Sequence, residues 1–222
     1  MNITNKIMNK STRFERKWVF RNNDHLLVLN FLLRSNFFFK FHYPPRYVNS
    51  IYFDDKNLSS ITSSIEGVSD RKKYRIRWYG HNNQTKLNFE IKEKKGFETT
   101  KKIISLEKFK NVEDLTDIIR FVNEEIVLDK VLQPTLLINY HRIYLISSNN
   151  LIRATIDYEI KCKRLLNFEN NFFSNFSNVI LELKYDSNLD QTVRNLLKNI
   201  KVRYSKNSKY VNSALNYVTS FS

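Results

Sequence analysis

The sequence predicts an α+β fold in which an antiparallel β-barrel, closed or nearly closed, has helices packed on its outside. Two observations predict this fold. Segments with charged residues at every second position recur along the chain, and the positions between those residues are largely apolar. Because successive side chains of a strand point to opposite faces, each segment would have one charged and one apolar face. In a curled sheet the charged faces would line the interior, and helices would cover the apolar exterior.

The segment at residues 71–79 shows this alternation most clearly. Its apolar positions include Tyr74, Ile76 and Trp78, and cations stand between them. These cations are Arg71, Lys73, Arg75 and Arg77. Side chains on one strand face are about 7 Å apart and like charges repel, so this face favours an anionic partner.

The same alternation recurs in several further segments. The residues that would share a strand face are Arg13, Glu15 and Lys17; Glu90, Lys92 and Lys94; Tyr140, Arg142 and Tyr144; Arg153, Thr155 and Asp157; and Glu182 and Lys184. In an ordinary sandwich the charged face would be the solvated one, and the pattern alone leaves this alternative open. A curled sheet with a charged interior is the interpretation that we carry forward.

The charge balance narrows the class of partner. Lys and Arg number 37 and Asp and Glu number 22, so the formal net charge is +15. This excess favours nucleic acid, a membrane surface or a polyanionic small substrate. Cations threaded through strands beside carboxylates favour a lined cavity among these. The chain has only three glycines and lacks a P-loop or dinucleotide fingerprint, so side chains must hold any nucleotide.

The length of 222 residues suits one domain. We expect residues 1–10 to form a flexible tail and residues 11–222 to form the domain. Cys162 is the only cysteine, which excludes an internal disulfide and is consistent with a reducing compartment. The longest apolar run is far shorter than the ~20 residues of a membrane span, and the first ten residues lack the apolar centre of a signal peptide. We therefore expect a soluble, cytoplasmic protein.

Hydrophobic periodicity and turn residues predict the elements in order. In the first half we expect strands at residues 11–20, 47–53, 71–79, 86–94 and 99–105, and helices at residues 25–34 and 54–67. Pro44 and Pro45 are expected to end the aromatic segment that precedes the second strand. In the second half we expect strands at residues 136–146, 151–160 and 179–185, and helices at residues 111–127, 190–200 and 208–217.

In chain order, these motifs resemble the VTC domain, the polyphosphate polymerase domain of the triphosphate tunnel (CYTH-like) superfamily. The charged segments already given carry the resemblance, together with Tyr52, Phe53 and Asp54, and with Ser208, Lys209 and Tyr210. The resemblance implies an antiparallel tunnel whose basic walls hold ATP and a growing polyphosphate chain. It also implies Mn²⁺ or Mg²⁺ held by a glutamate. The chain resembles the solitary bacterial form, and its Arg13 matches the polymerase branch where related hydrolases favour glutamate.

The resemblance implies roles for particular residues. Phosphate contacts at the catalytic centre are implied for Lys17, Arg75, Arg77, Lys92, Arg142, Arg153, Lys184 and Lys209. Further substrate contacts are expected from Arg13, Arg71, Lys73, Lys94, Lys206 and Tyr140. Glu182 is implied as the metal ligand. Glu15 and Glu90 are second candidates for the metal, but they are equally suited to pairing with neighbouring cations, as is Asp157.

The leading functional prediction is a metal-dependent transferase that moves the γ-phosphate of ATP to polyphosphate. Cations and a metal neutralise the equatorial phosphate oxygens, and an already ionised polyphosphate end needs no general base. Two alternatives stay open: a tripolyphosphate or nucleoside triphosphate hydrolase of the same fold, and a non-catalytic module that binds polyphosphate or RNA. We expect no specific nucleic-acid partner and no membrane span, and the sequence does not give the oligomeric state.

If Arg75 and Arg77 line a closed cavity, their charges repel each other in a poorly solvated space. We therefore expect the removal of either side chain to cost little stability.

Overall fold

The computed structural model describes residues 13–21, 24–80, 86–96, 98–109, 111–112, 115–126, 128–165, 173–198, 202, 204–205 and 208–219. The predicted tail at residues 1–10 lies outside these ranges. Within them, no helix combines the length and the apolarity that crossing a bilayer requires.

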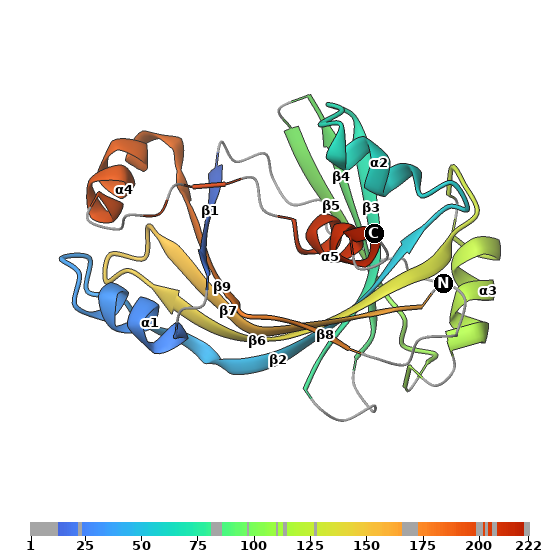
Figure 1. Cartoon of the computed structure of the whole chain (residues 1–222), viewed down its shortest axis with the longest axis horizontal. Helices are drawn as coiled ribbons and strands as arrows, with labels where there is room; N and C mark the ends of the chain where they lie inside the picture. Colours follow the sequence, from blue (N-terminus) through green and yellow to red (C-terminus); the bar gives the residue numbers. More distant parts are fainter. Residues whose placement is uncertain are drawn as a thin grey trace.

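Nine strands form one antiparallel sheet (Figure 1). Eight of them follow the order β1-β9-β7-β6-β2-β3-β4-β5, and β8 lies beside β7. The strands are β1 (Arg13–Arg21), β2 (Lys40–Asp54), β3 (Arg71–Tyr79), β4 (Asn88–Lys95), β5 (Glu98–Ser105), β6 (Gln133–Ile146), β7 (Arg153–Arg164), β8 (Ser174–Phe176) and β9 (Asn178–Asp186). The sheet curls so that β1 lies opposite β4 and β5 on its concave side, which we call the hollow (Figure 1). No ladder joins β1 to β5 among the described strands. The predicted α+β fold is confirmed as an antiparallel half-barrel.

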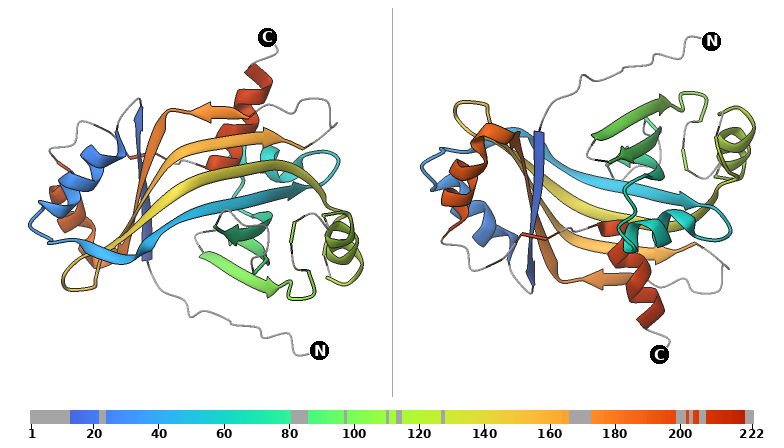
Figure 2. Two further views of the ribbon diagram at one scale, coloured as in Figure 1. Left: turned by 90° about the horizontal axis from the view of Figure 1, so that it is seen from below. Right: turned by 90° about the horizontal axis from the view of Figure 1, so that it is seen from above.

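The convex face of the sheet is apolar and carries helices at both ends. At one end α1 (His25–Leu33) and α4 (Asp190–Leu197) pack on β1, β9, β7 and β6, burying Trp18 and Leu183. At the other end α3 (Leu115–Glu124) packs over β3 and β4, burying Ile76 and Phe89. Figure 2 shows these helices at the two ends of the molecule. The apolar positions of the alternating segments therefore form the helix-covered exterior that the sequence predicts.

The concave face has a smaller cluster of apolar side chains at one end. There α5 (Lys209–Thr219) enters the hollow and packs against β6, and α2 (Ser59–Ile65) lies next to α5 (Figure 1). The Tyr210 ring stacks on Tyr52 at 4.6 Å between ring centres. Helix α5 thus differs from α1, α3 and α4, because it packs on the concave face and carries its first residues toward the charged part of that face.

Two details of the strands differ from the prediction. Pro44 and Pro45 lie inside β2 instead of ending a segment before it. They are tolerated because, among the described residues, β3 pairs with β2 only from Val48 onward, and because the register of β2 against β6 shifts at these prolines. The short strand β8 was not predicted, since three residues are too few for an alternation to be recognised.

Asp54 joins several elements at the end of β2. It is fully buried and accepts hydrogen bonds from the backbone N–H groups of Ser60 and Ile61 at 2.9 and 3.0 Å. The Tyr210 hydroxyl donates to it at 3.2 Å, and the Lys130 ammonium lies 3.3 Å away. One carboxylate therefore holds together β2, α2, α5 and the segment before β6.

We expect Asp54→Asn to destabilise the protein by about 3 kcal/mol, because an amide leaves donors and a buried ammonium incompletely satisfied. For a chain of this size, the melting temperature should fall by about 10 °C. Asp117→Asn is the matched control, since Asp117 is 64% exposed and pairs with Arg120 on the surface of α3. Equal melting temperatures for the two variants would contradict the role assigned to Asp54.

Candidate functional site

The register of the strands brings the charged segments together on the concave face. Directly paired residues point to the same face of a sheet. Across β1, β9 and β7 the paired residues are Lys17, Glu182 and Thr155, and across β2, β3 and β4 they are Tyr52, Arg75 and Glu90. Arg142 on β6 pairs with Asp157 on β7 in the middle of the sheet. The alternation in sequence has therefore become one continuous charged wall.

The first part of this wall is a cluster of two glutamates and three lysines. Lys17 Nζ lies 3.0 Å from Glu15 Oε1 and 3.3 Å from Glu182 Oε2. Lys184 Nζ lies 3.0 Å from Glu182 and 3.6 Å from Glu15. The 3.7 Å contact from Lys92 to Glu15 runs from β4 to β1, so it spans the hollow between strands that are not neighbours in the sheet.

The lysines keep both glutamates ionised. Burial raises the pKa of Glu182, but Lys17 and Lys184 outweigh it and hold that pKa well below its usual range. Burial and Glu182 likewise oppose the ionisation of Glu15, and the surrounding lysines still lower its pKa. Both carboxylates are therefore anionic oxygen donors at neutral pH, inside a region with more cations than anions.

The second part of the wall centres on Asp157, which is fully buried. Arg142 donates two hydrogen bonds to it, at 2.6 Å to Oδ1 and at 2.7 Å to Oδ2, and Lys209 at the start of α5 also contacts Oδ2. Burial raises the pKa of Asp157, but Arg142 and Lys209 outweigh it and lower that pKa. Asp157 thus positions two of the predicted phosphate contacts, and this geometry favours a pairing role for it over a metal role.

The third part contains Arg75 and Arg77, which differ in their partners. The Arg75 Nε donates to Glu90 at 2.6 Å, and Lys101 binds the other Glu90 oxygen at 2.7 Å. Arg77 donates to Ser50 Oγ at 3.2 Å and to the Tyr140 hydroxyl at 3.0 Å. Both Glu90 oxygens are engaged, which favours the pairing role over the metal role for this residue.

These contacts change the expectation for stability. Removing Arg75 would leave Lys101 as the one cation in ion-pair contact with the buried Glu90 among the described residues. The deletion of Arg75 should therefore cost more stability than the sequence predicts. Arg77 has no carboxylate partner among the described residues, and for it the expectation stands.

Lys73 and Tyr52 are titratable groups whose pKa values lie close to neutral pH. Lys73 Nζ donates to Ser208 Oγ at 3.0 Å, which links β3 to the start of α5. Burial lowers the pKa of Lys73 to about 8, and repulsion from Arg71 and Lys92 adds to this effect. Burial raises the pKa of Tyr52, but Arg75 and Arg77 outweigh it and bring that pKa to about 8.

We expect the affinity for tripolyphosphate to fall above about pH 8, by up to about tenfold per pH unit for each of the two groups that titrate. A bound anion raises the pKa of Lys73, so binding takes up a proton and is favoured while Lys73 is charged. Ionisation of Tyr52 adds a negative charge over the same range and acts in the same direction. Calorimetric titrations between about pH 7 and about pH 9.5 measure the Kd for tripolyphosphate on both sides of these two pKa values.

Lys73→Arg is the matched variant for that measurement, since arginine stays charged throughout the range. The titration of the ligand is common to both proteins and cancels in the comparison. An identical pH profile for the variant would contradict the assignment to Lys73.

The remaining predicted residues lie toward the edges of this wall or outside the described part. Arg71 pairs in register with Lys94 at the far end of β3 and β4, and Arg153 pairs with Lys184. Arg153 is exposed. Arg13 pairs with Asp186 through its backbone, but its side chain is outside the description, as is the whole of Lys206.

The sequence prediction missed Lys101, which faces Lys92 across β4 and β5 and binds Glu90. Lys101 and Lys102 are adjacent, so alternation alone does not tell which of them faces the hollow. The prediction included Tyr140 but gave Ser50 no role, although both receive hydrogen bonds from Arg77.

The donors on the concave face fit a divalent metal only together with a phosphate ligand. Within the described residues, no group of three His, Cys, Asp or Glu side chains is arranged to hold a metal ion by itself. Glu182 and Glu15 supply two carboxylates, and the neighbouring Thr155 hydroxyl is buried without a hydrogen-bond partner among the described residues. Magnesium commonly binds through one or two carboxylates plus substrate phosphates and waters, which this set of oxygens allows.

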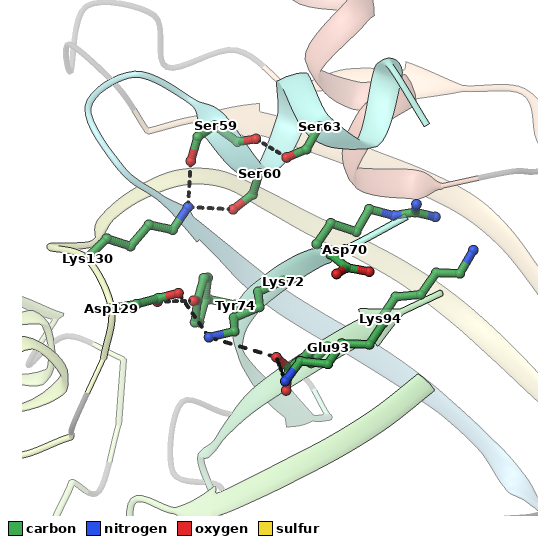
Figure 3. A pocket seen from close by; sticks show the side chains of 12 residues that line it. Ser59, Ser60, Ser63, Asp70, Lys72, Tyr74, Glu93, Lys94, Asp129 and Lys130 are labelled. Atoms are coloured by element: carbon green, nitrogen blue, oxygen red, sulfur yellow. Dashed lines mark hydrogen bonds and ion pairs between the residues drawn. The ribbon is translucent and has the colours of Figure 1, made fainter. Parts of the chain in front are cut away.

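A separate cavity of about 300 Å³ lies beside α2 and the ends of β3 and β4 (Figure 3). Three of its cations are paired with carboxylates: Lys130 contacts Asp55, Lys72 contacts Asp129 and Glu93, and Lys95 contacts Glu93. Arg71 and Lys94 also line it. Because most of its charge is paired, we place the functional site on the concave face and not in this cavity.

Comparisons with known proteins agree with this fold. The family model of the VTC domain matches residues 12–217. Similar solved structures include the PH1819 protein from Pyrococcus horikoshii OT3, with a TM-score of 0.56, 12% identity, and coverage of 92% of this chain and 99% of that chain. A putative adenylate cyclase from Bacillus halodurans gives a TM-score of 0.56, 13% identity, and coverage of 93% and 98%.

A putative adenylate cyclase from Vibrio parahaemolyticus gives a TM-score of 0.52, 10% identity, and coverage of 91% and 97% of the two chains. At these identities the likeness is one of fold alone. No curated protein matches the sequence.

Proposed function

The chain belongs to the VTC domain family, and from this premise we propose that it is a polyphosphate polymerase that transfers the γ-phosphate of ATP to a polyphosphate chain. The observation that carries the proposal is the concave wall, where Lys17, Arg77, Arg142, Lys184 and Lys209 surround one hollow. Phosphoryl transfer requires positioning and charge neutralisation more than covalent participation by the protein. A fixed set of cations in a partly desolvated hollow supplies both.

The residues of the wall fall into two groups under this proposal. Arg77 and Lys184 have donors to spare for phosphate oxygens, and Lys17 can exchange one of its two carboxylate contacts for a phosphate. Asp157 holds Arg142 in place, and Glu90 holds Arg75 in place. These ion pairs fix the orientation of the two guanidinium groups. The wall is therefore preorganised before substrate enters.

Glu182, with Glu15 beside it, is the residue that would hold Mn²⁺ or Mg²⁺ together with the phosphates. A divalent metal bound there would add positive charge next to the phosphoryl group that is transferred. Glu182 also distinguishes this proposal from a non-catalytic anion-binding module. A carboxylate between Lys17 and Lys184 weakens anion binding by itself, so a cation that joins it accounts for its presence better than anion binding does.

Transfer is favoured over hydrolysis by the groups near the site. The end of a polyphosphate chain is already ionised at neutral pH, whereas water needs a base to accept its proton. The described carboxylates of the wall carry hydrogen-bonding cations and have lowered pKa values, which makes them weak bases. A hydrolase of the same fold remains the second candidate because a metal-bound water would supply its own nucleophile.

The test is to incubate the protein with ATP and Mn²⁺ or Mg²⁺ and to measure ADP, free phosphate and acid-stable polymer in the same samples. We expect ADP to be matched by phosphate in the polymer. Free phosphate equal to ADP, with no polymer, would establish the hydrolase instead. ATP left unchanged under all metal conditions would favour the binding module.

A further inference from the structure

A group of aromatic side chains around one arginine lies on the concave face, next to the phosphate-binding cations. We call it the aromatic mouth, and it consists of Tyr43, Arg46, Tyr79 and Tyr144. The Arg46 guanidinium carbon lies 5.6, 5.4 and 5.8 Å from the ring centres of Tyr43, Tyr79 and Tyr144. The rings of Tyr43 and Tyr144 meet edge to face at 5.8 Å. Nothing in the proposed phosphoryl transfer uses this group.

An irregularity in β2 builds the aromatic mouth. Tyr43 pairs with Tyr144 and Arg46 pairs with Arg142, so three steps on β2 match two steps on β6. In a regular strand, residues three apart point to opposite faces. This bulge, which contains Pro44 and Pro45, instead places Tyr43 and Arg46 on the face of Arg142. The bulge at these two prolines therefore brings Tyr43 and Arg46 to the face that carries the phosphate-binding cations.

The aromatic mouth is continuous with the phosphate-binding wall. The Tyr144 ring lies 5.9 Å from the Arg142 guanidinium, which in turn lies 5.3 Å from the ring of Tyr140. The Tyr140 hydroxyl accepts a hydrogen bond from Arg77. Successive residues on one face of a strand are about 7 Å apart, so a nucleoside at the mouth would have its phosphates at Arg142 and beyond.

The mouth is also accessible. Tyr43 is 48% exposed, Arg46 is exposed, and Tyr79 and Tyr144 are half-buried. Ring faces and a guanidinium plane are the groups on which nucleobases stack in proteins. A bare phosphate chain has no flat face and gains nothing from such rings.

We propose that the aromatic mouth binds the nucleoside base of the nucleotide substrate by stacking, with Tyr43, Tyr79 and Arg46 as its main contacts. This inference rests on the proposed function, because it assigns a base-binding subsite to the nucleotide whose phosphates the wall would hold. It gives a role to the tyrosines at one end of the hollow, whereas Arg71 and Lys94 pair in register at the opposite end. It also predicts selectivity between ligands that share a triphosphate and differ only in the nucleoside.

The test compares the binding of ATP and of inorganic tripolyphosphate, each without turnover, to the native protein and to Tyr43→Ala. Because the variant loses the ring on which the base would stack, the Kd for ATP should rise about tenfold. The Kd for tripolyphosphate should change less than about twofold, because no charge is altered. Tyr43→Phe keeps the ring and should bind ATP like the native protein.

Tyr204→Ala is the matched control. The Tyr204 ring also lies over an arginine, 4.7 Å from the Arg16 guanidinium, but Arg16 is on the convex side of β1. Its removal should leave both Kd values unchanged. Melting temperatures of all variants show whether each protein is folded.

Two results would overturn this inference while leaving the proposed function in place. One is an equal loss of ATP and tripolyphosphate affinity in Tyr43→Ala, which would make the ring structural. The other is an unchanged Kd for ATP. If the native protein binds neither ligand, the proposed function fails and this inference fails with it.

Discussion

Glu182→Gln is expected to lose metal-dependent turnover almost completely, by about a thousandfold or more. A metal placed against a transferring phosphoryl group supplies several kcal/mol of charge stabilisation, and each 1.36 kcal/mol is a factor of ten in rate. Glutamine has the same shape and lacks the anionic oxygens. The initial rate of ADP formation with saturating Mn²⁺ measures the loss.

The same variant should bind tripolyphosphate without metal at least as tightly as the native protein. Removing a carboxylate from between Lys17 and Lys184 lowers the repulsion that an anionic ligand meets. A role in folding alone would instead weaken binding and turnover together. Lys17 keeps its 3.0 Å contact with Glu15, so we expect the variant to stay folded. Its melting temperature should be lower than that of the native protein, because the contacts of the Glu182 carboxylate with Lys17 and Lys184 stabilise the fold.

Glu93→Gln is the matched control for Glu182→Gln. Glu93 also lies on a strand between two lysines, Lys72 and Lys95, but it belongs to the opposite face of β4. Its replacement should leave turnover unchanged. Undiminished activity in Glu182→Gln would refute the metal assignment.

Arg77→Met is expected to lose activity by about 100- to 1,000-fold at both low and high salt. A desolvated donor aimed at transition-state charge typically contributes about 3–4 kcal/mol, and salt screens such a contact poorly. The native and variant proteins should be compared in polymer synthesis at about 50 mM and about 500 mM salt, which spans strong and weak screening.

Stability is the second readout for Arg77→Met. The arginine is 7% exposed and lies among other cations, so an apolar side chain of similar length should leave the melting temperature close to native. Arg120→Met, which removes a 63% exposed arginine from α3, should change neither activity nor melting. A mild defect in Arg77→Met that high salt removes would mean that the wall behaves as an open basic surface.

The alternation of charge predicted which residues face the hollow, because a period of two is a local property of a strand. It placed Arg75 and Arg77 on one side and Tyr74 and Ile76 on the other, as the structure has them. The pairing of these strands is not local. The contact between Lys92 and Glu15 joins residues of two unpaired strands and depends on the curl of the whole sheet.

Other parts of the site could not be predicted from the sequence, for different physical reasons. The amphipathic pattern of residues 208–217 predicted a helix but not which surface it covers, and α5 packs inside the hollow. Adjacent Lys101 and Lys102 offer no alternation to interpret. The bulge at Pro44 and Pro45 reverses the side on which Tyr43 lies, and a strict period of two would have placed it wrongly.

The most direct test of the central claim is a crystal structure of the protein with tripolyphosphate bound. The account predicts that the phosphates lie on the concave face, within hydrogen-bonding distance of Arg77, Arg142 and Lys184. Phosphates bound only on the convex face, or only in the cavity beside Lys130, would contradict it.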